Sequence, residues 1–317
     1  MKKTRTLALI GGIVAAASLA LTACSGPASA GSAGSGDAAM TIAVVTPYLS
    51  NASTKEVIDL FTEDAESRGW QVSVEDTAGD MNKLNSAFQN AAAQQPDAIV
   101  LGMGDPTQVS LGLKSAADAG VPVFAIDAAE ADGIAANVTS DNTDLGEQSA
   151  NALIEAMGGT GAVVMLTHDP HPGVKERAAG AKAVFDKAGI TILESKHVEV
   201  PGPVDDARKS VQDLLSAHGD AVTGIWGGWD EPALGATQAL QAAGVTGVPV
   251  VGIDGQDFAL AEVAKGGPFT ATVKQDWEAI AAQVADLIEA NAAGTAPEKT
   301  QYELPGTLVT KDNAGQG

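Results

Sequence analysis

The sequence predicts an α/β protein made of two similar lobes, each with a parallel β-sheet covered by helices on both faces. From Met40 onward, short apolar runs rich in β-branched residues alternate with amphipathic stretches, a rhythm typical of parallel sheets. The runs are too many for one compact sheet. Two of them also resemble each other: DAGVPVFAID ends at Asp127 and GVTGVPVVGID ends at Asp254. In both, a glycine ends a helix, Val-Pro opens a buried strand and an aspartate follows it, so we expect two lobes.

The individual elements follow from the periodicity of the apolar residues. Residues 55–68 and 83–94 carry apolar side chains at helical spacing and are expected to be helices that connect strands. The expected strands are residues 41–46, 71–76, 98–101, 121–127, 162–167, 191–200, 222–226, 248–254 and 269–275. The alternation of helices and strands excludes all-β and all-helical folds.

The first residues are expected to form an export signal and not part of the fold. A basic start is followed by an almost wholly apolar run from Leu7 to Leu21, which is too short to span a bilayer comfortably. The run leads to Leu21-Thr22-Ala23-Cys24, and Cys24 is the only cysteine in the 317 residues. This is the pattern of a bacterial lipoprotein cleavage site. The alternative is a plain secretory signal with a coincidental thiol.

We therefore expect residues 1–23 to be a lipoprotein signal peptide and Cys24 to be lipidated, which leaves no thiol for disulfides or thiolate catalysis. The lipid would anchor the protein outside the cytoplasmic membrane. Residues 24–39 are the expected flexible tether, because they contain little besides Ser, Gly, Ala and Pro. Folding is expected to begin near Met40.

The chain is strongly acidic. It has 40 Asp and Glu residues against 18 Lys and Arg, a net charge of −22. Such a charge repels nucleic acid and anionic lipid headgroups, so binding to either is not expected.

The ligand is expected beyond the carboxyl ends of the strands, where open parallel sheets bind their ligands. Asp127 and Asp254 follow apolar strands directly, and an ionised carboxylate there can accept hydrogen bonds from ligand hydroxyls. Capping of the next helix is the alternative, but the equivalent positions in two lobes favour binding. Arg177 lies on the first turns of a helix, where a cation gains nothing from the helix dipole. A ligand oxygen or an aspartate is its expected partner.

Two tryptophans mark the mouth of another strand. Trp226 and Trp229 bracket two glycines where a strand runs into a helix, which Asp230 is expected to cap. A tryptophan here can stack on the C–H side of a sugar or polyol while its indole N–H donates. Core packing is the alternative, and it applies more to Trp226 than to Trp229.

No catalytic or metal-binding motif emerges. His168 and His171 flank Asp169 in THDPHPG, but this spacing matches zinc sites poorly. No metal is expected, and a hydrogen-bonding role or plain loop chemistry remains for the histidines. The sequence has no Gly-x-Ser-x-Gly elbow, no Lys-Ser/Thr phosphate loop and no dinucleotide fingerprint after the first strand. We expect neither an enzyme nor a cofactor.

At these residues the chain closely resembles the ribose-type periplasmic sugar-binding proteins, the extracytoplasmic receptors of ABC importers. The similarity includes SDN at 140–142, KER at 175–177, WDEPALGA at 229–236, VVGIDG at 250–255 and TVKQ at 272–275. It implies the type I periplasmic binding protein fold: two Rossmann-like lobes with parallel sheets and a three-crossover hinge near Asp141, Gln275 and Leu304. The implied N-terminal lobe is 40–141 plus 276–304. The implied C-terminal lobe is 142–275 plus 305–317, and the two close on a ligand.

The resemblance also implies site residues. By position, the family's polar contacts fall on Asn51, Asp127, Arg177, Asp254 and Gln275. The chain departs from ribose binders at several positions. Ser53 and Thr54 stand where those proteins have a phenylalanine pair, and Ala128 stands where they have an arginine. A further phenylalanine of theirs falls near Gly202, and their asparagine is Trp229 here. These departures put ribose itself in doubt and suggest that the stacking surface has moved to the second lobe, at Trp229.

The expected ligand is a neutral sugar or polyol, because the loss of an arginine leaves more negative than positive charge around it. An ammonium-bearing ligand under Trp229 is an alternative. The expected protein is a monomeric, lipid-anchored extracytoplasmic receptor that delivers its ligand to the permease subunits of an ABC importer. The alternatives are a receptor reporting a sugar or furanose-like signal to a sensor kinase or chemoreceptor, and a surface enzyme using Asp127 and Asp254 as a carboxylate pair.

Overall fold

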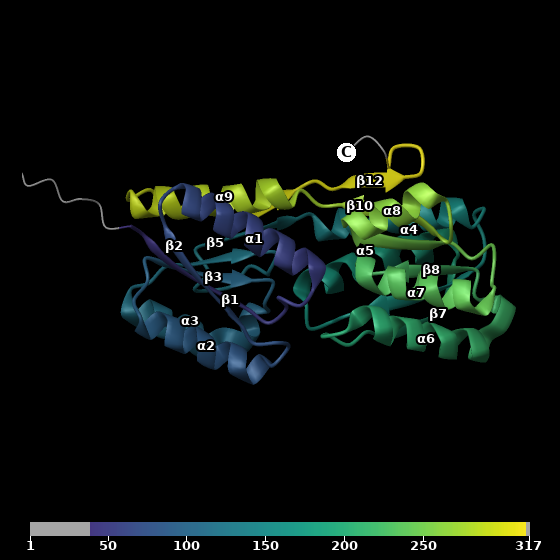
Figure 1. Ribbon diagram of the computed structural model, residues 1–317, viewed down its shortest axis with the longest axis horizontal. Coiled ribbons are helices and arrows are strands. Elements are labelled where there is room, and N and C mark those ends of the chain that lie inside the picture. The colour runs from purple at the N-terminus through teal and green to yellow at the C-terminus, as the bar shows by residue number, and fades with distance from the viewer. Residues whose placement is uncertain (1–38, 315–317) are drawn as a thin grey trace, which may run out of the picture. The chain divides into compact units, whose positions relative to one another are not determined.

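The computed structural model describes residues 39–314, which form two six-stranded sheets (Figure 1). The expected signal peptide, Cys24 and nearly all of the expected tether lie outside the described residues. None of the described helices is both long and apolar enough to cross a bilayer.

The first sheet is parallel throughout. Its strands are β1 (Thr41–Thr46), β2 (Gln71–Asp76), β3 (Ala98–Gly102), β4 (Val123–Ile126), β5 (Ala136–Ser140) and β11 (Gln301–Leu304). Their order across the sheet is β11-β5-β4-β3-β1-β2. Every residue of β3, β4 and β5 is buried, as expected where helices cover both faces.

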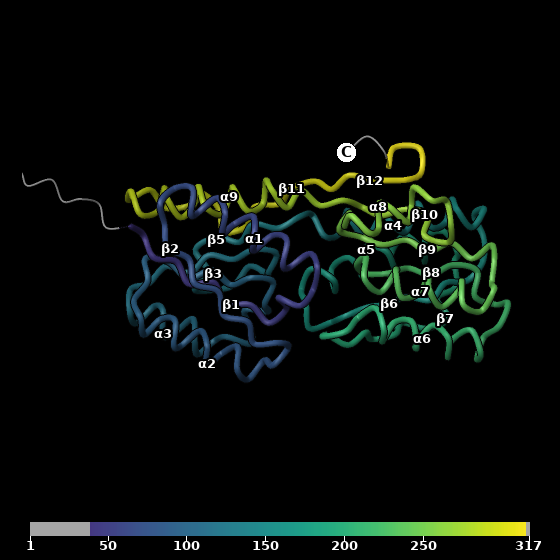
Figure 2. Tube along the Cα trace, in the orientation of Figure 1, coloured from purple at the N-terminus to yellow at the C-terminus, as the bar shows by residue number. Residues whose placement is uncertain are grey.

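The second sheet repeats this plan. Its strands are β6 (Ala162–Thr167), β7 (Thr191–His197), β8 (Gly224–Gly227), β9 (Val250–Asp254), β10 (Phe269–Lys274) and β12 (Thr307–Thr310). The order is β12-β10-β9-β8-β6-β7. The pairs are parallel except at the edge, where β12 runs antiparallel to β10. In Figure 2 the yellow end of the chain reaches this sheet as β12.

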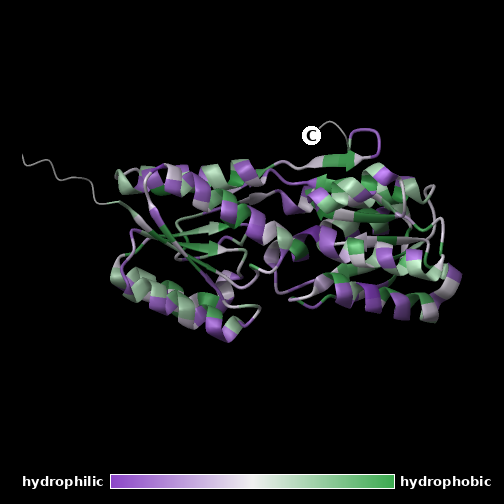
Figure 3. Cartoon of the chain, viewed as in Figure 1, coloured by the Kyte–Doolittle hydropathy of each residue, from purple (hydrophilic) through white to green (hydrophobic). Residues whose placement is uncertain are grey.

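Helices cover both faces of each sheet, and their apolar sides face it (Figure 3). On the first sheet, α1 (Ala52–Ser67) and α9 (Trp277–Ala292) contribute to one apolar cluster, and α2 (Met81–Ala93) and α3 (Ser110–Ala119) contribute to the other. We call this sheet and these helices the first lobe. A 3₁₀ turn, η1 (Pro106–Val109), precedes α3.

The second lobe is the second sheet with its own helices. One face carries α4 (Asn142–Ala156) and α5 (Pro172–Ala188). The other face carries α6 (Pro203–His218), α7 (Asp230–Ala243) and α8 (Asp257–Lys265), and the 3₁₀ turn η2 (Gly219–Ala221) follows α6.

The chain passes between the lobes after β5, after β10 and between β11 and β12. This confirms the predicted fold class of two α/β lobes with parallel sheets and a three-crossover hinge.

The element boundaries predicted from sequence need correction in places. β4 is shorter than residues 121–127, β7 ends before residue 200, and the first helix begins at Ala52 and not at Lys55. The strands β5, β11 and β12 were not among those predicted. In β5, Asn137, Thr139 and Ser140 are polar although buried, so apolar periodicity could not reveal the strand.

Candidate functional site

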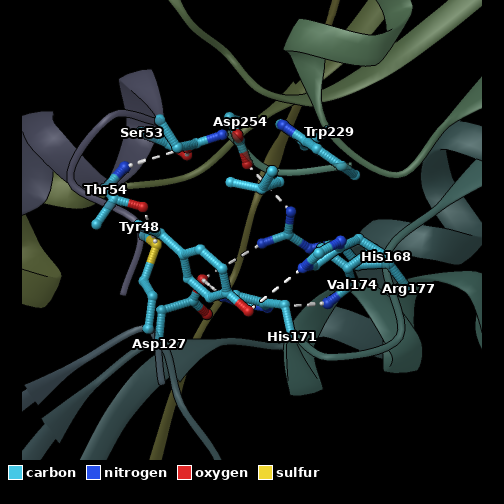
Figure 4. Close-up of a pocket in the computed structure, with 13 residues that line it drawn as sticks. Tyr48, Ser53, Thr54, Asp127, His168, His171, Val174, Arg177, Trp229 and Asp254 are labelled. Atoms are coloured by element: carbon cyan, nitrogen blue, oxygen red, sulfur yellow. Dashed lines mark hydrogen bonds and ion pairs between the residues drawn. The ribbon is translucent and has the colours of Figure 1, made fainter. Parts of the chain in front are cut away.

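A cavity lies between the two lobes at the carboxyl ends of both sheets (Figure 4). Its walls come from segments that follow strands of both sheets and from helix α5, so neither lobe forms it alone. It is lined by Tyr48, Asn51, Ser53, Thr54, Met103, Asp127, His168, His171, Val174, Arg177, Val200, Trp229 and Asp254.

Arg177 joins the carboxylates of the two lobes. Its Nη1 lies 3.1 Å from Asp254 Oδ1 in the second lobe, and its Nη2 lies 3.5 Å from Asp127 Oδ2 in the first. The guanidinium also donates to Asn142 Oδ1 at 2.7 Å and to the Gly228 carbonyl at 3.2 Å. Because these contacts use donors on several sides of a planar group, they fix its orientation in the cavity.

The position of Arg177 depends on close packing of α4 against α5. A Cβ added to Gly146 would lie 2.0 Å from the Arg177 carbonyl oxygen, and one added to Gly180 would lie 2.4 Å from the Thr143 carbonyl oxygen. The two helix backbones therefore touch at these glycines. Only a residue without a side chain permits this approach.

Asp127 and Asp254 have unusual backbone conformations. Asp127 has a φ of 44° and Asp254 a φ of 125°, where side-chain-bearing residues are strained, and such strain clusters at functional sites. Neither aspartate caps a helix, because Asp127 is followed by β5 and the N-cap of α8 is Gln256. The capping alternative is wrong for both.

Burial raises the pKa of Asp254 to about 6, although Arg177 and the hydrogen bond from Gln275 oppose that rise. The Gln275 side chain donates to Asp254 Oδ1 at 2.8 Å. Gln275 itself is not among the residues that line the cavity. It reaches the site through Asp254.

Asn51 has two structural roles in addition to its place in the cavity wall. It is the N-cap of α1, since its Oδ1 accepts from the Thr54 amide at 3.4 Å and from Ser53 Oγ at 2.7 Å. Its Nδ2 donates to Glu231 of the second lobe. One N–H of the amide is then left for a ligand.

The two tryptophans have different surroundings. Trp229 lines the cavity, whereas Trp226 is fully buried and donates to Ser149 Oγ at 2.9 Å. The prediction that Asp230 caps the following helix is wrong, since the N-cap is Trp229. Asp230 turns inward and accepts from Thr272 Oγ1 at 2.7 Å and from the Gln256 amide at 2.8 Å.

Sequence reasoning missed Tyr48, which lines the cavity from the first lobe. Its ring centroid lies 5.6 Å from that of His168, in an edge-to-face arrangement. The first lobe therefore also provides an aromatic ring to the cavity wall. Tyr48 is one of only two tyrosines and follows β1 by two residues, a signal that could have revealed it.

His168 and His171 are both buried at the cavity. His168 donates from Nδ1 to the Val198 carbonyl at 2.9 Å, so its Nε2 accepts from the Tyr48 hydroxyl at 3.3 Å. His171 Nδ1 accepts from the Val174 amide at 3.2 Å and caps α5. Burial lowers the pKa of His168 and lowers that of His171 to about 4, so both rings are neutral at pH 7.

The described residues contain no group of three or more His, Cys, Asp and Glu side chains that could hold a metal ion. The cavity has room for little as it stands, because the centre of a water-sized sphere can reach only about 30 Å³ of it. One water needs about 10–15 Å³ by that measure. The lobes or the lining side chains must therefore move before a molecule of monosaccharide size can enter.

Residues 42–296 match the family model described as a periplasmic binding protein domain. Among curated relatives, the D-apiose import binding protein of Actinobacillus succinogenes is 27% identical over 277 residues, covering 86% of this chain and 89% of that protein. The xylitol-binding protein of Mycolicibacterium smegmatis is 29% identical over 314 residues, covering 96% and 86%. The ribose import binding protein of Bacillus subtilis is 28% identical over 243 residues, covering 75% and 77%.

Solved structures agree in fold. An ABC transporter solute-binding protein of Agrobacterium vitis with bound allitol has a TM-score of 0.82 and 28% identity, covering 88% of this chain and 97% of that one. One from Mycobacterium smegmatis with bound glycerol has a TM-score of 0.81 and 26% identity, covering 88% and 96%. The family model spans most of the described residues, and both lobes are present. The chain belongs to the periplasmic binding protein family, whose members are binding proteins and not enzymes.

Proposed function

We propose that the chain is an extracytoplasmic, lipid-anchored receptor that binds a neutral sugar or sugar alcohol between its lobes and delivers it to an ABC permease. One observation carries this proposal: in a cavity lined by both lobes, Arg177 contacts Asp254 of one lobe and Asp127 of the other. A ligand hydroxyl both donates and accepts, so it can pair with guanidinium and carboxylate groups together.

The charges of the cavity favour a neutral ligand. Two carboxylates and one guanidinium line it, and the guanidinium is already paired with both. With both histidines neutral, the lining offers no unpaired cation to a phosphate or carboxylate ligand. The relatives' names support the same class, since they mention apiose, xylitol and ribose, and one similar structure holds allitol. Names that specify import favour transport over sensing.

We assign direct ligand contacts to Asn51, Asp127, Arg177, Trp229 and Asp254, with Gln275 orienting Asp254. The proposal also includes the lobe boundaries, namely 40–141 plus 276–304 for the first lobe and 142–275 plus 305–317 for the second. It further includes a monomeric state, which light scattering after gel filtration would test.

Calorimetry tests the ligand class. The purified chain is titrated with matched pairs (ribose and ribitol, xylose and xylitol, allose and allitol) and with apiose and glycerol. We expect at least one to bind at a Kd near the micromolar range, about −8 kcal/mol. Arg177→Ala should abolish that heat. Arg208→Ala should preserve it, because Arg208 is a partly exposed residue of α6 that pairs only with Asp205 among the described residues. No heat and no thermal shift with any compound would refute the ligand class.

The anchor is tested separately. Wild-type chain and Cys24→Ser are expressed in a bacterium supplied with labelled fatty acid. We expect label and membrane association for the wild type, and neither for Cys24→Ser. Equal labelling of the two chains would rule out Cys24 as the lipidation site.

A further inference from the structure

Polar side chains hold the two lobes together outside the Arg177 network. Asn51 at the start of α1 donates to Glu231 at the start of α7. Nearby, the Gln256 side chain of the second lobe donates to Glu56 of α1 at 2.7 Å. These contacts join helix N-termini across the cleft, and they cannot persist when the lobes separate.

Glu231 is central to the first of these contacts. Its Oε2 accepts from Asn51 Nδ2 of the first lobe and from Trp229 Nε1 of the second at 3.3 Å. Both donors belong to residues that line the cavity, whereas Glu231 itself does not line it. The carboxyl group therefore positions one cavity residue of each lobe.

His171 makes a further cross-lobe contact. Its Nε2 faces Asp127 Oδ2 at 3.8 Å, and its ring centroid lies 6.0 Å from that of Tyr48, also of the first lobe. The His171 side chain is 8% exposed. Residues of the first lobe provide part of that burial, so opening the cleft would expose the ring to water.

We propose that Glu231 and His171 are positioning residues that tie closure of the cleft to pH in opposite directions. The proposal rests on the proposed function in one respect only, namely that the lobes open and close around a ligand.

The direction in which each residue links closure to pH follows from how burial changes its pKa. Burial raises the pKa of Glu231 from 4.5 to about 7, and the hydrogen bonds from Trp229 and Asn51 only partly offset it. If an open cleft restores the ordinary value, closure takes up a proton between these limits and becomes less favourable as pH rises. Burial lowers the pKa of His171 from 6.5 to about 4. Closure of the lobes therefore releases a proton from His171, so closure becomes more favourable as pH rises.

Other charged groups lie near Glu231 and His171. Asp254 of β9 acts on Glu231 directly by like-charge repulsion. Asp127 and Arg177 both act on His171, the first raising and the second lowering its pKa. His168 contacts Tyr48 across the cleft, and burial lowers its pKa as it lowers that of His171. Further charged groups near these elements are Glu56 on α1, Asp105 before η1, Asp169 after β6, Glu176 on α5, Glu199 after β7 and Asp230 on α7.

The experiment measures closure without a ligand, so that a wrong ligand class cannot obscure the result. Spin labels are placed at Lys83→Cys on α2 and Lys209→Cys on α6, which are exposed positions on the two lobes, in a chain carrying Cys24→Ser. Electron double resonance gives the closed-to-open ratio between pH 4.5 and 8. Glu231→Gln keeps an oxygen acceptor but cannot titrate, and His171→Asn keeps an oxygen that can cap α5.

Between pH 4.5 and 6.5 the linkage of Glu231 opposes that of His171 in the wild type, so the wild-type slope should lie between the slopes of the two variants. In Glu231→Gln the closed-to-open ratio should rise with pH relative to the wild type, by up to about tenfold per unit, the limit for one proton. In His171→Asn it should fall with pH relative to the wild type. Glu56→Gln, the matched cross-lobe control, should leave the wild-type slope unchanged.

Unchanged slopes in Glu231→Gln and His171→Asn, or slopes that move in the same direction, would overturn the proposal. Circular dichroism at each pH establishes that the variants are folded, and His171→Gln replaces His171→Asn if the latter is not. Should calorimetry find no sugar or polyol ligand, these slopes still decide the question.

Discussion

Arg177 and Asp254 form an ion pair within the second lobe, with Nη1 and Oδ1 3.1 Å apart and both side chains 2% exposed. Asp127, by contrast, reaches the same guanidinium from the first lobe at 3.5 Å. The first pair is therefore held by one lobe, while the second contact needs both lobes together. The Arg177–Asp254 pair can therefore persist when the lobes separate, whereas the contact with Asp127 cannot.

Arg177→Met should destabilise the protein as well as remove ligand binding. It leaves the carboxylates of Asp127 and Asp254 buried without their cation, and breaking a buried pair in this way costs about 3–5 kcal/mol. Urea unfolding measures the free energy. Arg208→Ala serves as the surface comparison and should stay within about 0.5 kcal/mol of the wild type. Equal stability of Arg177→Met and the wild type would contradict the buried pair.

Asp254→Asn should weaken ligand binding about tenfold to a hundredfold, because a charge-assisted hydrogen bond is worth about 1.5–3 kcal/mol. Asp257→Asn, three residues along on the exposed side of α8, is the control and should bind normally. Calorimetry with whichever sugar or polyol binds the wild type gives both values. Normal binding by Asp254→Asn would remove Asp254 from the ligand site.

Asp230→Asn should change how stability depends on pH. Burial raises the pKa of Asp230 well above its ordinary value, and repulsion from Asp254 adds to the rise. A raised carboxyl pKa favours folding at acid pH, and that contribution is lost as pH rises toward the folded value. Asparagine can keep both bonds, accepting from the Gln256 amide and donating to Thr272.

The variant should therefore gain stability relative to the wild type between pH 5 and pH 8. Thermal unfolding at each pH gives the difference. A constant difference in Tm across this range would show that Asp230 has the same protonation in the folded and unfolded chains.

Gly146→Ala should lower stability and binding together. The new Cβ would meet the Arg177 carbonyl oxygen at 2.0 Å, so α5 must move away from α4 and carry Arg177 with it. Overpacking of this kind typically costs about 1–3 kcal/mol. Gly267→Ala, where nothing lies within 4 Å of the added Cβ, should be neutral. Full binding by a folded Gly146→Ala would show that the position of Arg177 tolerates the shift.

Trp229→Phe should retain most of the binding because it keeps an aromatic face, while Trp229→Ala should lose about tenfold, near 1.4 kcal/mol. Trp226→Phe should leave affinity unchanged and act on stability instead, since Trp226 is buried with Ser149. If Trp229→Ala binds as the wild type does, the indole does not contact the ligand.

The sequence predicted the fold and most of the polar residues that the cavity brings together. Asp127 and Asp254 end strands that alternate with helices, and parallel topology places such ends at one edge of a sheet. Local patterns were therefore sufficient for these two residues. The strand β5 was missed because its buried polar side chains carry no apolar period, and Asp230 was misassigned because its partners, Thr272 and Gln256, are far along the chain.

The cross-lobe partners could not be predicted from sequence. Tyr48 meets His168 across 120 residues and Asn51 meets Glu231 across 180. No periodicity or motif connects residues at such separations, because their contact depends on how the two sheets face each other.

The sequence by itself determined the two α/β lobes, the acidic charge and the strand ends that Asp127 and Asp254 follow or close, since each of these depends on local composition and period. The tertiary structure alone decided which side chains line the cavity together, which of them form ion pairs or hydrogen bonds, and which titratable side chains are uncharged. Pairing and pKa depend on distance and burial, and both arise only when residues from two lobes exclude water from the same cavity.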